Sequence, residues 1–217
     1  MNKVIVRPAR PGAGITTIPS DLRSIEALRA AATNCRACPL WRHATQTVFG
    51  EGSEEAPLLI VGEQPGDRED TAGHPFVGPA GRLLDRALEE SGVTREGVYV
   101  TNAVKHFKWQ LRGKRRLHKT PAQREVEACA PWLEAEMATL DPRVVLCLGA
   151  TAARAVLRTT VRVNEARGHT LRSPQGRNVV VTVHPAYLLR LRPPAVEEVY
   201  EQFFQDVQNA VRLASKR

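Results

Sequence analysis

A run of cations that ends in a histidine, Gly113-Lys114-Arg115-Arg116-Leu117-His118-Lys119, has the clearest capacity for chemistry in this chain. Adjacent cations can hold a phosphate backbone by charge alone. A neutral imidazole beside them can act as a nucleophile. The alternative is a solvated basic loop whose histidine has no chemical role. We expect the segment to bind a polyanion, with His118 as the candidate nucleophile.

A second segment, Gly62-Glu63-Gln64-Pro65-Gly66, follows an apolar run and forms a tight Gly/Pro turn. Such a turn can hold the Glu63 carboxylate and the Gln64 amide rigidly near a reacting atom. Asp67 follows at the expected start of a helix or turn. A nucleotide site is disfavoured here, because the turn carries an acid and lacks the lysine of a P-loop.

Three further side chains could recognise a nucleobase. Phe76 lies on a loop between glycines, where it could stack on a flipped base or simply plug the core. Asn102 ends an apolar run, and its amide could read the Watson–Crick edge of a pyrimidine or cap the backbone. His184, before Pro185, could donate a hydrogen bond to an anionic leaving group.

Strand and helix patterns alternate along the chain. Four apolar runs are typical of buried parallel strands, at residues 57–61, 98–102, 143–148 and 178–183. Helical patterns occupy residues 80–91, 121–140, 150–157 and 194–215, and a first helix runs to Ala32 from a cap at Ser20 or Asp21. Residues 160–176 are turn-rich and could form a hairpin. We predict an α/β fold, a three-layer α/β/α sandwich around a central four-stranded, mainly parallel sheet.

Residues just beyond the carboxyl ends of such strands face the ligand crevice. The segments in these positions are 62–66, 102–106, 149–151 and 184–185. The candidate carboxylate, amide and histidine should therefore converge on one edge of the sheet.

Length and charge limit the class of protein. The chain has 217 residues, which suits a single domain over residues 21–217 after a flexible segment at residues 1–20. Its 31 Lys and Arg against 23 Asp and Glu give a net charge of +8, which favours nucleic acid as the partner over a merely basic protein. We expect a cytoplasmic, nucleoid-associated monomer with no membrane partner, since neither a membrane-spanning run nor a signal-peptide core is present.

Four segments together resemble the uracil-DNA glycosylase superfamily, and most closely its iron–sulfur family-4 branch. They are Gly-Glu-Gln-Pro-Gly-Asp at 62–67, Gly-His-Pro-Phe-Val-Gly-Pro-Ala-Gly at 73–81, Thr-Asn-Ala-Val-Lys at 101–105 and His-Pro-Ala-Tyr-Leu-Leu-Arg at 184–190. Ordinary family-4 enzymes lack the Lys-Arg-Arg-Leu-His segment at 114–118. With Gly-Glu-Gln-Pro-Gly, this segment is similar to the UdgX subgroup, whose members cross-link to DNA after excising uracil.

The resemblance implies a uracil-DNA glycosylase-like fold and a role for each pocket residue. Phe76 would stack on the extruded uracil and Asn102 would hydrogen-bond its edge, in a pocket that includes Gly62. His184 would stabilise negative charge on uracil as the N-glycosidic bond breaks and leaves an oxocarbenium-like sugar.

The resemblance also implies a covalent outcome and a single turnover. His118 would take the place of water and bond to C1′. Glu63 would stabilise the cation or accept the histidine proton, with Gln64 and Asp67 in the same catalytic turn. Arg116 would hold the loop, and the remaining cations would contact phosphates without sequence preference: Lys114, Arg115 and Arg190.

Two other functions stay open. A conventional, multiple-turnover glycosylase would use His118 only to grip DNA. A metal-stabilised module could bind uracil-containing or single-stranded DNA without cutting any bond, although such a binder has no need of a carboxylate opposite a strand-end histidine.

The cysteines suggest a metal centre. Cys35 and Cys38 form a C-x-x-C pair, and Cys129 and Cys147 lie far along the chain. Cys147 falls within a strand pattern, where a thiol behaves as a small hydrophobe. The resemblance places a ligand after residues 101–105, where this chain has His106.

The implied ligand set is Cys35, Cys38, His106 and Cys129 around a structural 4Fe-4S cluster. Cys147 in place of His106 is one alternative, and three unrelated thiols with a surface histidine is another. Zinc would suit the spacing equally well, and only the resemblance favours iron.

Overall fold

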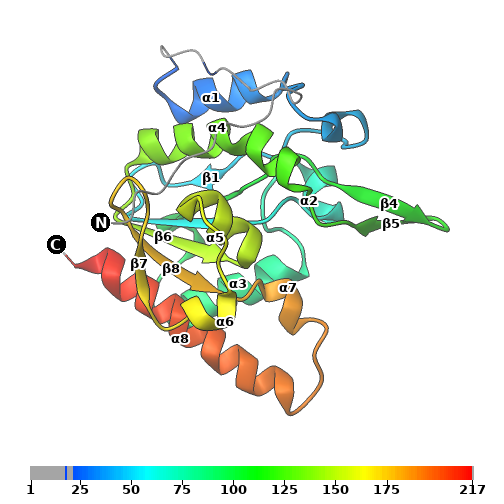
Figure 1. Cartoon of the computed structure of the whole chain (residues 1–217). Coiled ribbons are helices and arrows are strands. Elements are labelled where there is room, and N and C mark those ends of the chain that lie inside the picture. Colours follow the sequence, from blue (N-terminus) through cyan, green and yellow to red (C-terminus); the bar gives the residue numbers. More distant parts are fainter. Residues whose placement is uncertain (1–17, 19–21, 217) are drawn as a thin grey trace.

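A six-stranded sheet of order β1-β3-β2-β6-β8-β7 forms the centre of the computed structural model, which describes residue 18 and residues 22–216 (Figure 1). Its four middle strands are parallel. They are β3 (Tyr99–Asn102), β2 (Leu58–Gly62), β6 (Val144–Leu148) and β8 (Asn178–Thr182). The short edge strands β1 (Glu51–Gly52) and β7 (Thr170–Arg172) pair antiparallel with β3 and β8.

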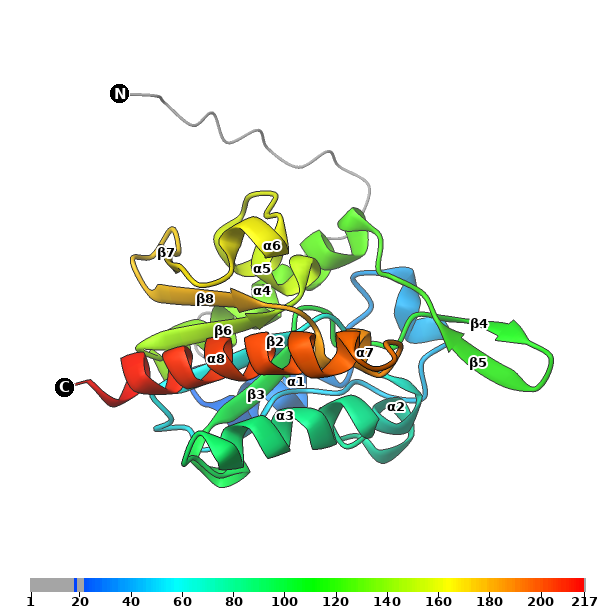
Figure 2. The same ribbon diagram turned by 90° about the horizontal axis from the view of Figure 1, so that it is seen from below.

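Helices cover both faces of the sheet (Figure 2). One face is covered by α4 (Gln123–Leu140), α5 (Ala150–Leu157) and α6 (Val163–Ala166), and α1 (Ile25–Ala32) packs on α4 (Figure 1). The other packs against α3 (Pro79–Glu90) and α8 (Ala195–Ser215). Side chains of the middle strands alternate between these two cores, as a pleated strand requires.

The predicted three-layer α/β fold is confirmed, and all four predicted parallel strands are present. The sheet nevertheless has six strands rather than four. The edge strands span two and three residues and carry polar side chains, so neither forms an apolar run. The hairpin placed within residues 160–176 is wrong in its bounds, because that stretch holds α6 and β7, and β7 pairs with β8.

The first helix begins later than expected. α1 starts at Ile25, and the Ser24 hydroxyl accepts a hydrogen bond from the Ala27 N–H at 3.2 Å. The expected caps, Ser20 and Asp21, lie outside the described residues. Apart from Ile18, so does the flexible segment expected at residues 1–20. Within the described part of the chain, no helix has the length and apolar character to cross a bilayer.

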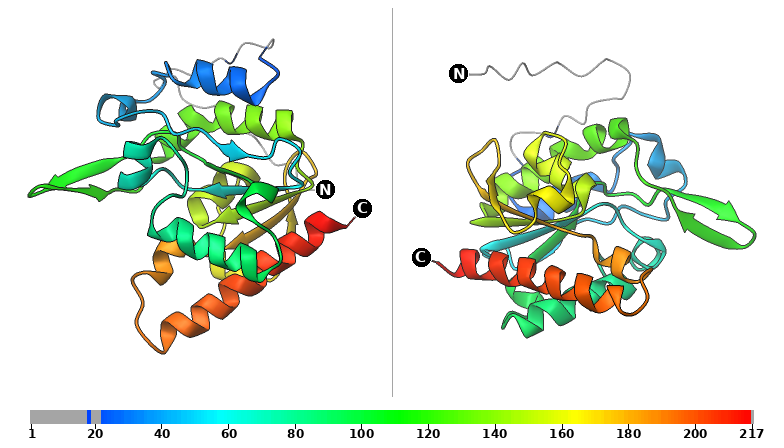
Figure 3. Two further views of the ribbon diagram at one scale, coloured as in Figure 1. Left: turned by 180° about the vertical axis from the view of Figure 1, so that it is seen from behind. Right: turned by 60° about the horizontal axis from the view of Figure 1, so that its bottom comes forward.

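The basic segment is a β-hairpin rather than a loop. β4 (Trp109–Arg112) and β5 (Arg115–His118) pair antiparallel, with Trp109 opposite His118. Gly113 turns the chain between them with φ 61°, a left-handed conformation that glycine adopts without strain. The hairpin projects away from the sandwich in every view (Figures 1 and 3). Sequence pattern missed these strands because neither has a buried face.

Four short helices complete the fold around the strand ends. They are η1 (Pro39–Arg42), α2 (Asp67–Ala72), η2 (Arg95–Gly97) and α7 (Pro185–Leu188).

Candidate active site

Gly62, Asn102 and Phe76 lie together at the carboxyl ends of β2 and β3 and form the candidate base-binding pocket. Gly62 and Asn102 are register partners across the two strands. A Cβ atom added to Gly62 would collide with Asn102 Oδ1 and lie 2.5 Å from Phe76 Cζ. Glycine is therefore required here, because any side chain would push the amide and the ring apart.

Asn102 presents a buried acceptor toward this pocket. The residue is 2% exposed, and its Oδ1 atom has no hydrogen-bond partner among residues 22–216. An unpaired buried oxygen is unfavourable unless a ligand donates to it. The backbone-capping alternative is not supported, because this oxygen caps nothing in the described structure.

Phe76 adopts an unusual backbone conformation, with φ 57°. Its carbonyl packs so closely on Gly81 that a Cβ at position 81 would overlap it. The Phe76 ring stacks on His184, with centroids 6.0 Å apart and planes 25° from parallel. The ring also packs in the core beneath α3 and α8, so it lines the pocket and fills the core at once.

His184 is held as a neutral hydrogen-bond donor. Its Nδ1 accepts from the Ala186 N–H at 3.1 Å at the start of α7, so the proton of the neutral ring is on Nε2. Burial, together with the neighbouring His118 and Arg190, lowers its pKa to about 4. An uncharged Nε2–H can donate to an anion without carrying a charge into the pocket.

The Glu63 carboxylate lies between the first turn of α5 and the end of β5. Its Oε2 accepts a hydrogen bond from Thr151 Oγ1 at 2.6 Å, at the first turn of α5. Its Oε1 lies 3.4 Å from His118 Nε2. Residues 149–151 were expected at this edge, but no role was predicted for Thr151. A hydroxyl at a strand end beside a candidate carboxylate was the available signal.

His118 ends β5, and its side chain is about half exposed. Its ring lies 6.2 Å from the Phe107 ring. Burial lowers the pKa of His118, the Glu63 carboxylate opposes that shift, and Arg190 adds to it. The imidazole therefore stays neutral to lower pH than a free histidine, and one ring nitrogen keeps its lone pair.

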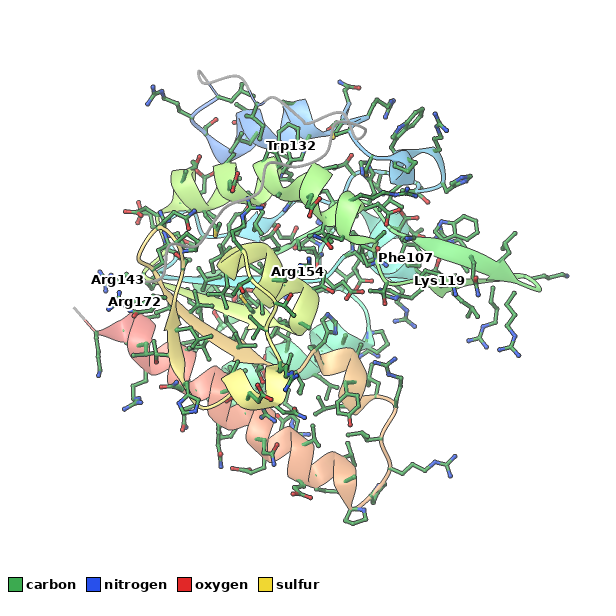
Figure 4. The ribbon with its side chains drawn as sticks, viewed as in Figure 1. Phe107, Lys119, Trp132, Arg143, Arg154 and Arg172 are labelled. Carbon is green, nitrogen blue, oxygen red and sulfur yellow. The ribbon has the colours of Figure 1, made fainter. Side chains whose placement is uncertain are left out.

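Gln64 holds the base of the hairpin. Its Nε2 donates to Lys108 O and Lys119 O at 3.2 and 3.0 Å, and its Oε1 accepts from Lys108 N at 3.0 Å. Figure 4 shows Phe107 and Lys119 at this base. Both the nitrogen and the oxygen of the Gln64 amide therefore bind the two ends of the hairpin. Neither atom remains available to contact a reacting atom.

Arg116 ties the hairpin to α2. Its guanidinium pairs with Asp67 Oδ1 at 2.5 Å and with Asp70 Oδ2 at 2.6 Å. Asp70 is fully buried and also accepts hydrogen bonds from the Thr45 N–H and hydroxyl. Asp67 is therefore an anchor for Arg116 rather than part of the pocket. Asp70 was missed, although its i, i+3 spacing from Asp67 puts both on one helix face.

The other predicted cations lie at two places. Lys114 and Arg115 are exposed at the hairpin tip and make no ion pair within the described part of the chain. Arg190 follows α7, close enough to His118 and His184 to lower the pKa of both.

Three thiols share one buried region between α1 and α4. The Cys35 Sγ accepts from Trp132 Nε1 at 3.3 Å, and Figure 4 shows Trp132 between these helices. The Cys129 Sγ accepts from the Lys105 N–H at 3.2 Å. Burial raises the pKa of Cys129 to about 12; Lys105 opposes the shift, and Cys38 and Cys35 contribute to it.

His106 follows Lys105 and is buried, so the surface-histidine alternative is wrong. Its Nε2 lies 3.0 Å from Thr47 Oγ1. Its pKa is lowered to about 4, mainly by burial, with Asp70 opposing the shift and Arg36 contributing to it, so the ring is neutral. Cys147 lies in β6 between Val61 and Val181, and burial alone raises its pKa, with no contribution from another thiol.

No three His, Cys, Asp or Glu side chains of residues 22–216 are close enough to hold one metal ion. A zinc site requires its ligands within about 2.3 Å of a single ion. An iron–sulfur cluster binds each ligand to a different iron, so its ligands stand farther apart, and N–H···S bonds are common around it. Three cysteines and a histidine are donors that either a zinc ion or an iron–sulfur cluster accepts.

Comparisons with known proteins agree with this geometry. A model of the uracil DNA glycosylase superfamily matches residues 49–208. The type-4 uracil-DNA glycosylase of Thermotoga maritima is 37% identical over 183 residues, which cover 84% of this chain and 90% of that protein. The type-4 uracil-DNA glycosylase of Pyrobaculum aerophilum is 38% identical over 173 residues, 76% of this chain and 85% of that protein. The Archaeoglobus fulgidus type-4 enzyme is 33% identical over 193 residues, 86% and 92% of the two chains.

Proposed function

Because the chain belongs to the uracil DNA glycosylase superfamily, we propose that it excises uracil from DNA by breaking the N-glycosidic bond. The observation that carries this proposal is the buried Asn102 Oδ1 beside the Phe76 ring, an oxygen with no hydrogen-bond partner among residues 22–216. Uracil offers an imide N–H to such an acceptor and a planar face to such a ring. Cytosine lacks that N–H, so the same oxygen disfavours it.

His184 supports the departure of the base. As the C1′–N1 bond breaks, its electron pair leaves with uracil as an anion, and the sugar becomes oxocarbenium-like. The neutral Nε2–H of His184 donates to that anion. The stacking of His184 on Phe76 supports a position for this donor beside the bound base.

We further propose that His118 captures the sugar, as the UdgX subgroup would. The lone pair of one imidazole nitrogen forms a bond to C1′ as the base leaves. The resulting imidazolium releases its remaining N–H proton, and the Glu63 carboxylate, 3.4 Å from Nε2, accepts it. The N–C1′ bond has no leaving group as good as uracil, so each protein molecule would react once.

Gln64 and Arg116 support the covalent step by fixing both ends of β5. Gln64 holds the backbone beside His118, and Arg116 pairs with Asp67 and Asp70 on α2. A hairpin that only bound DNA phosphates would not need His118 to be held in one position. The exposed Lys114 and Arg115, with Arg190 nearer the pocket, would contact the backbone of single-stranded or duplex DNA.

The proposed metal ligands are Cys35, Cys38, His106 and Cys129. These residues would hold a 4Fe-4S cluster that ties α1 to α4 and to the segment after β3. The cluster would be structural, because all four ligand positions come from protein. Zinc and ligation by Cys147 are the alternatives that metal analysis would distinguish.

A conventional enzyme that turns over many times is the second candidate. The half exposure of His118 favours it, since water could reach the sugar by the same route. A binding module without chemistry is a weaker candidate, because it leaves the Glu63–His118 contact without a purpose.

Base release tests the proposal. The purified protein is incubated with a uracil-containing, single-stranded oligonucleotide, and free uracil is measured by mass spectrometry beside alkali-cleavable product. Release of one equivalent by the parent, and of many by a His118→Ser variant that admits water, supports the covalent mechanism. Many equivalents from both would support the conventional enzyme, and no release from either would overturn glycosylase activity.

A further inference from the structure

Lys105 and Glu136 form an ion pair that is almost completely withdrawn from solvent. Their side chains are 1% and 0% exposed, and Lys105 Nζ lies 2.5 Å from Glu136 Oε2. A cation near a DNA site would ordinarily meet phosphate, but at this burial Lys105 cannot reach it. Two buried charges persist only where their hydrogen bonds are satisfied, so the contacts of this pair indicate its role.

The ammonium group of Lys105 is fully engaged. Besides Glu136, it donates to Thr101 Oγ1 at 2.6 Å and to the main-chain carbonyl of Asn102 at 2.8 Å. These three acceptors use its three N–H groups. The side chain thus folds back onto the last two residues of β3 and binds the carbonyl of the residue whose amide forms the pocket floor.

Glu136 anchors this arrangement to α4 and to the neighbouring backbone. Its carboxylate accepts from Thr101 Oγ1, from the Tyr99 hydroxyl and from the Gly50 N–H. Every donor comes from β3 or from the segment beside it. A shift of the β3 terminus would therefore break several hydrogen bonds at once.

The chain after β3 is fixed on its other side as well. Ala103 N–H donates to Gly62 O at 2.9 Å, and Val104 N–H donates to Glu63 O at 3.0 Å. The end of β3 is held between the catalytic turn and the buried ion pair. Asn102 Oδ1, which has no partner of its own in the described residues, depends on this backbone for its position.

We infer that Lys105, paired with Glu136, is a positioning residue for uracil recognition that acts through the main-chain carbonyl of Asn102. It touches neither base nor phosphate. The inference rests on the proposed glycosylase function, because it concerns the position of Asn102, the residue proposed to bind uracil in that reaction. Its expected signature is a loss in the rate of base release at unchanged affinity for DNA.

A Lys105→Met/Glu136→Gln double variant tests this inference without leaving a buried charge unpaired. The glutamine can still accept from Tyr99 and Gly50, so the fold is retained better than after Lys105→Met alone. A displacement near 1 Å at a reactive site reduces rates on the order of 100-fold. We expect the single-turnover rate of uracil release to fall on the order of 10- to 100-fold, with binding to uracil-free DNA within about 2-fold of the parent. Val207→Ala, a core truncation in α8, is the control for lost stability alone and should keep the parental rate.

Two further measurements separate positioning from a general structural role. In an Asn102→Ala background, the double substitution should lower the rate little further, because its effect passes through Asn102. A crystal structure of the double variant should show Asn102 displaced, a result that does not depend on activity. Three results would each overturn the inference. They are a parental rate of uracil release in the double variant, an equal fold-loss from the double substitution with and without Asn102→Ala, and an Asn102 that has not moved in the crystal structure. An inactive parent would instead overturn the proposed function and leave the crystal structure to decide the role of Lys105.

Discussion

His118 Nε2 lies 3.4 Å from Glu63 Oε1, although His118 ends the projecting hairpin and Glu63 belongs to the turn after β2. The Glu63 carboxylate raises the pKa of His118, but the partial burial of the ring lowers this pKa by more, so the net shift is downward. The imidazole is therefore neutral before reaction and has a proton acceptor beside it afterwards. This pairing is what a histidine nucleophile requires.

The anchor of the hairpin should affect capture more than base release. In an Arg116→Lys variant the charge is kept, but a single ammonium cannot pair with Asp67 and Asp70 as the guanidinium does. We expect the rate of covalent capture to fall on the order of 10-fold. Quantified adduct formation over time measures it.

Arg115→Lys is the matched control, since Arg115 neighbours Arg116 but is exposed. It should leave the capture rate unchanged at saturating DNA. Equal losses in the two variants would contradict an anchoring role for Arg116.

Gly62→Ala should close the base pocket. The added methyl group would collide with Asn102 Oδ1 and press on Phe76. We expect uracil release to fall on the order of 100-fold while affinity for uracil-free DNA is kept. Single-turnover kinetics and a binding titration measure the two quantities.

Gly97→Ala gives the comparison, because a Cβ there would meet only the Val93 side chain, at 3.3 Å. A Gly62→Ala protein with the parental rate would show that uracil does not occupy this pocket.

Sequence patterns predict most of this fold and part of the site. Buried parallel strands appear in the sequence as continuous apolar runs, because helices cover both of their faces. The sequence alone therefore predicted β2, β3, β6 and β8. Their order placed Glu63, Asn102 and His184 at one edge. The contacts of Gln64 and Asp67 with the hairpin were not identifiable, because they depend on where an exposed ribbon folds back. The pairing of Lys105 with Glu136 likewise joins distant segments that no local pattern relates.

The rate of covalent capture by His118 should fall only at a pH below the ordinary pKa of histidine. Burial holds the pKa of His118 below its ordinary value and that of His184 at about 4. Protonation removes the lone pair of His118, so activity is present above its depressed pKa and lost as the pH falls through it. We expect the midpoint of the acid decline to lie below about pH 6.5, where a free histidine is half protonated.

Glu63→Gln sharpens this test. The Glu63 charge raises the pKa of His118, so its removal should move the decline to still lower pH. A midpoint near 6.5 in the parent, or a shift toward neutral pH in the variant, would be inconsistent with a neutral histidine nucleophile beside the Glu63 carboxylate.

Metal content should follow the proposed ligands. Purified protein should contain iron and acid-labile sulfide, and Cys129→Ser or His106→Ala should reduce both. Cys147→Ala should keep them, since Cys147 is enclosed within β6. Elemental analysis with visible absorption measures the outcome. Loss of metal from Cys147→Ala, with retention in His106→Ala, would reverse the assignment, and zinc in place of iron would refute the cluster.

The most direct test of the central claim is a denaturing gel. The protein is incubated with a labelled, single-stranded oligonucleotide that contains one uracil, and with a thymine control, then heated in SDS. We predict a uracil-dependent band at the combined mass of protein and DNA, which peptide mass spectrometry assigns to His118. Abasic product well beyond one equivalent with no such band, or a cross-link at another residue, would contradict covalent capture by His118.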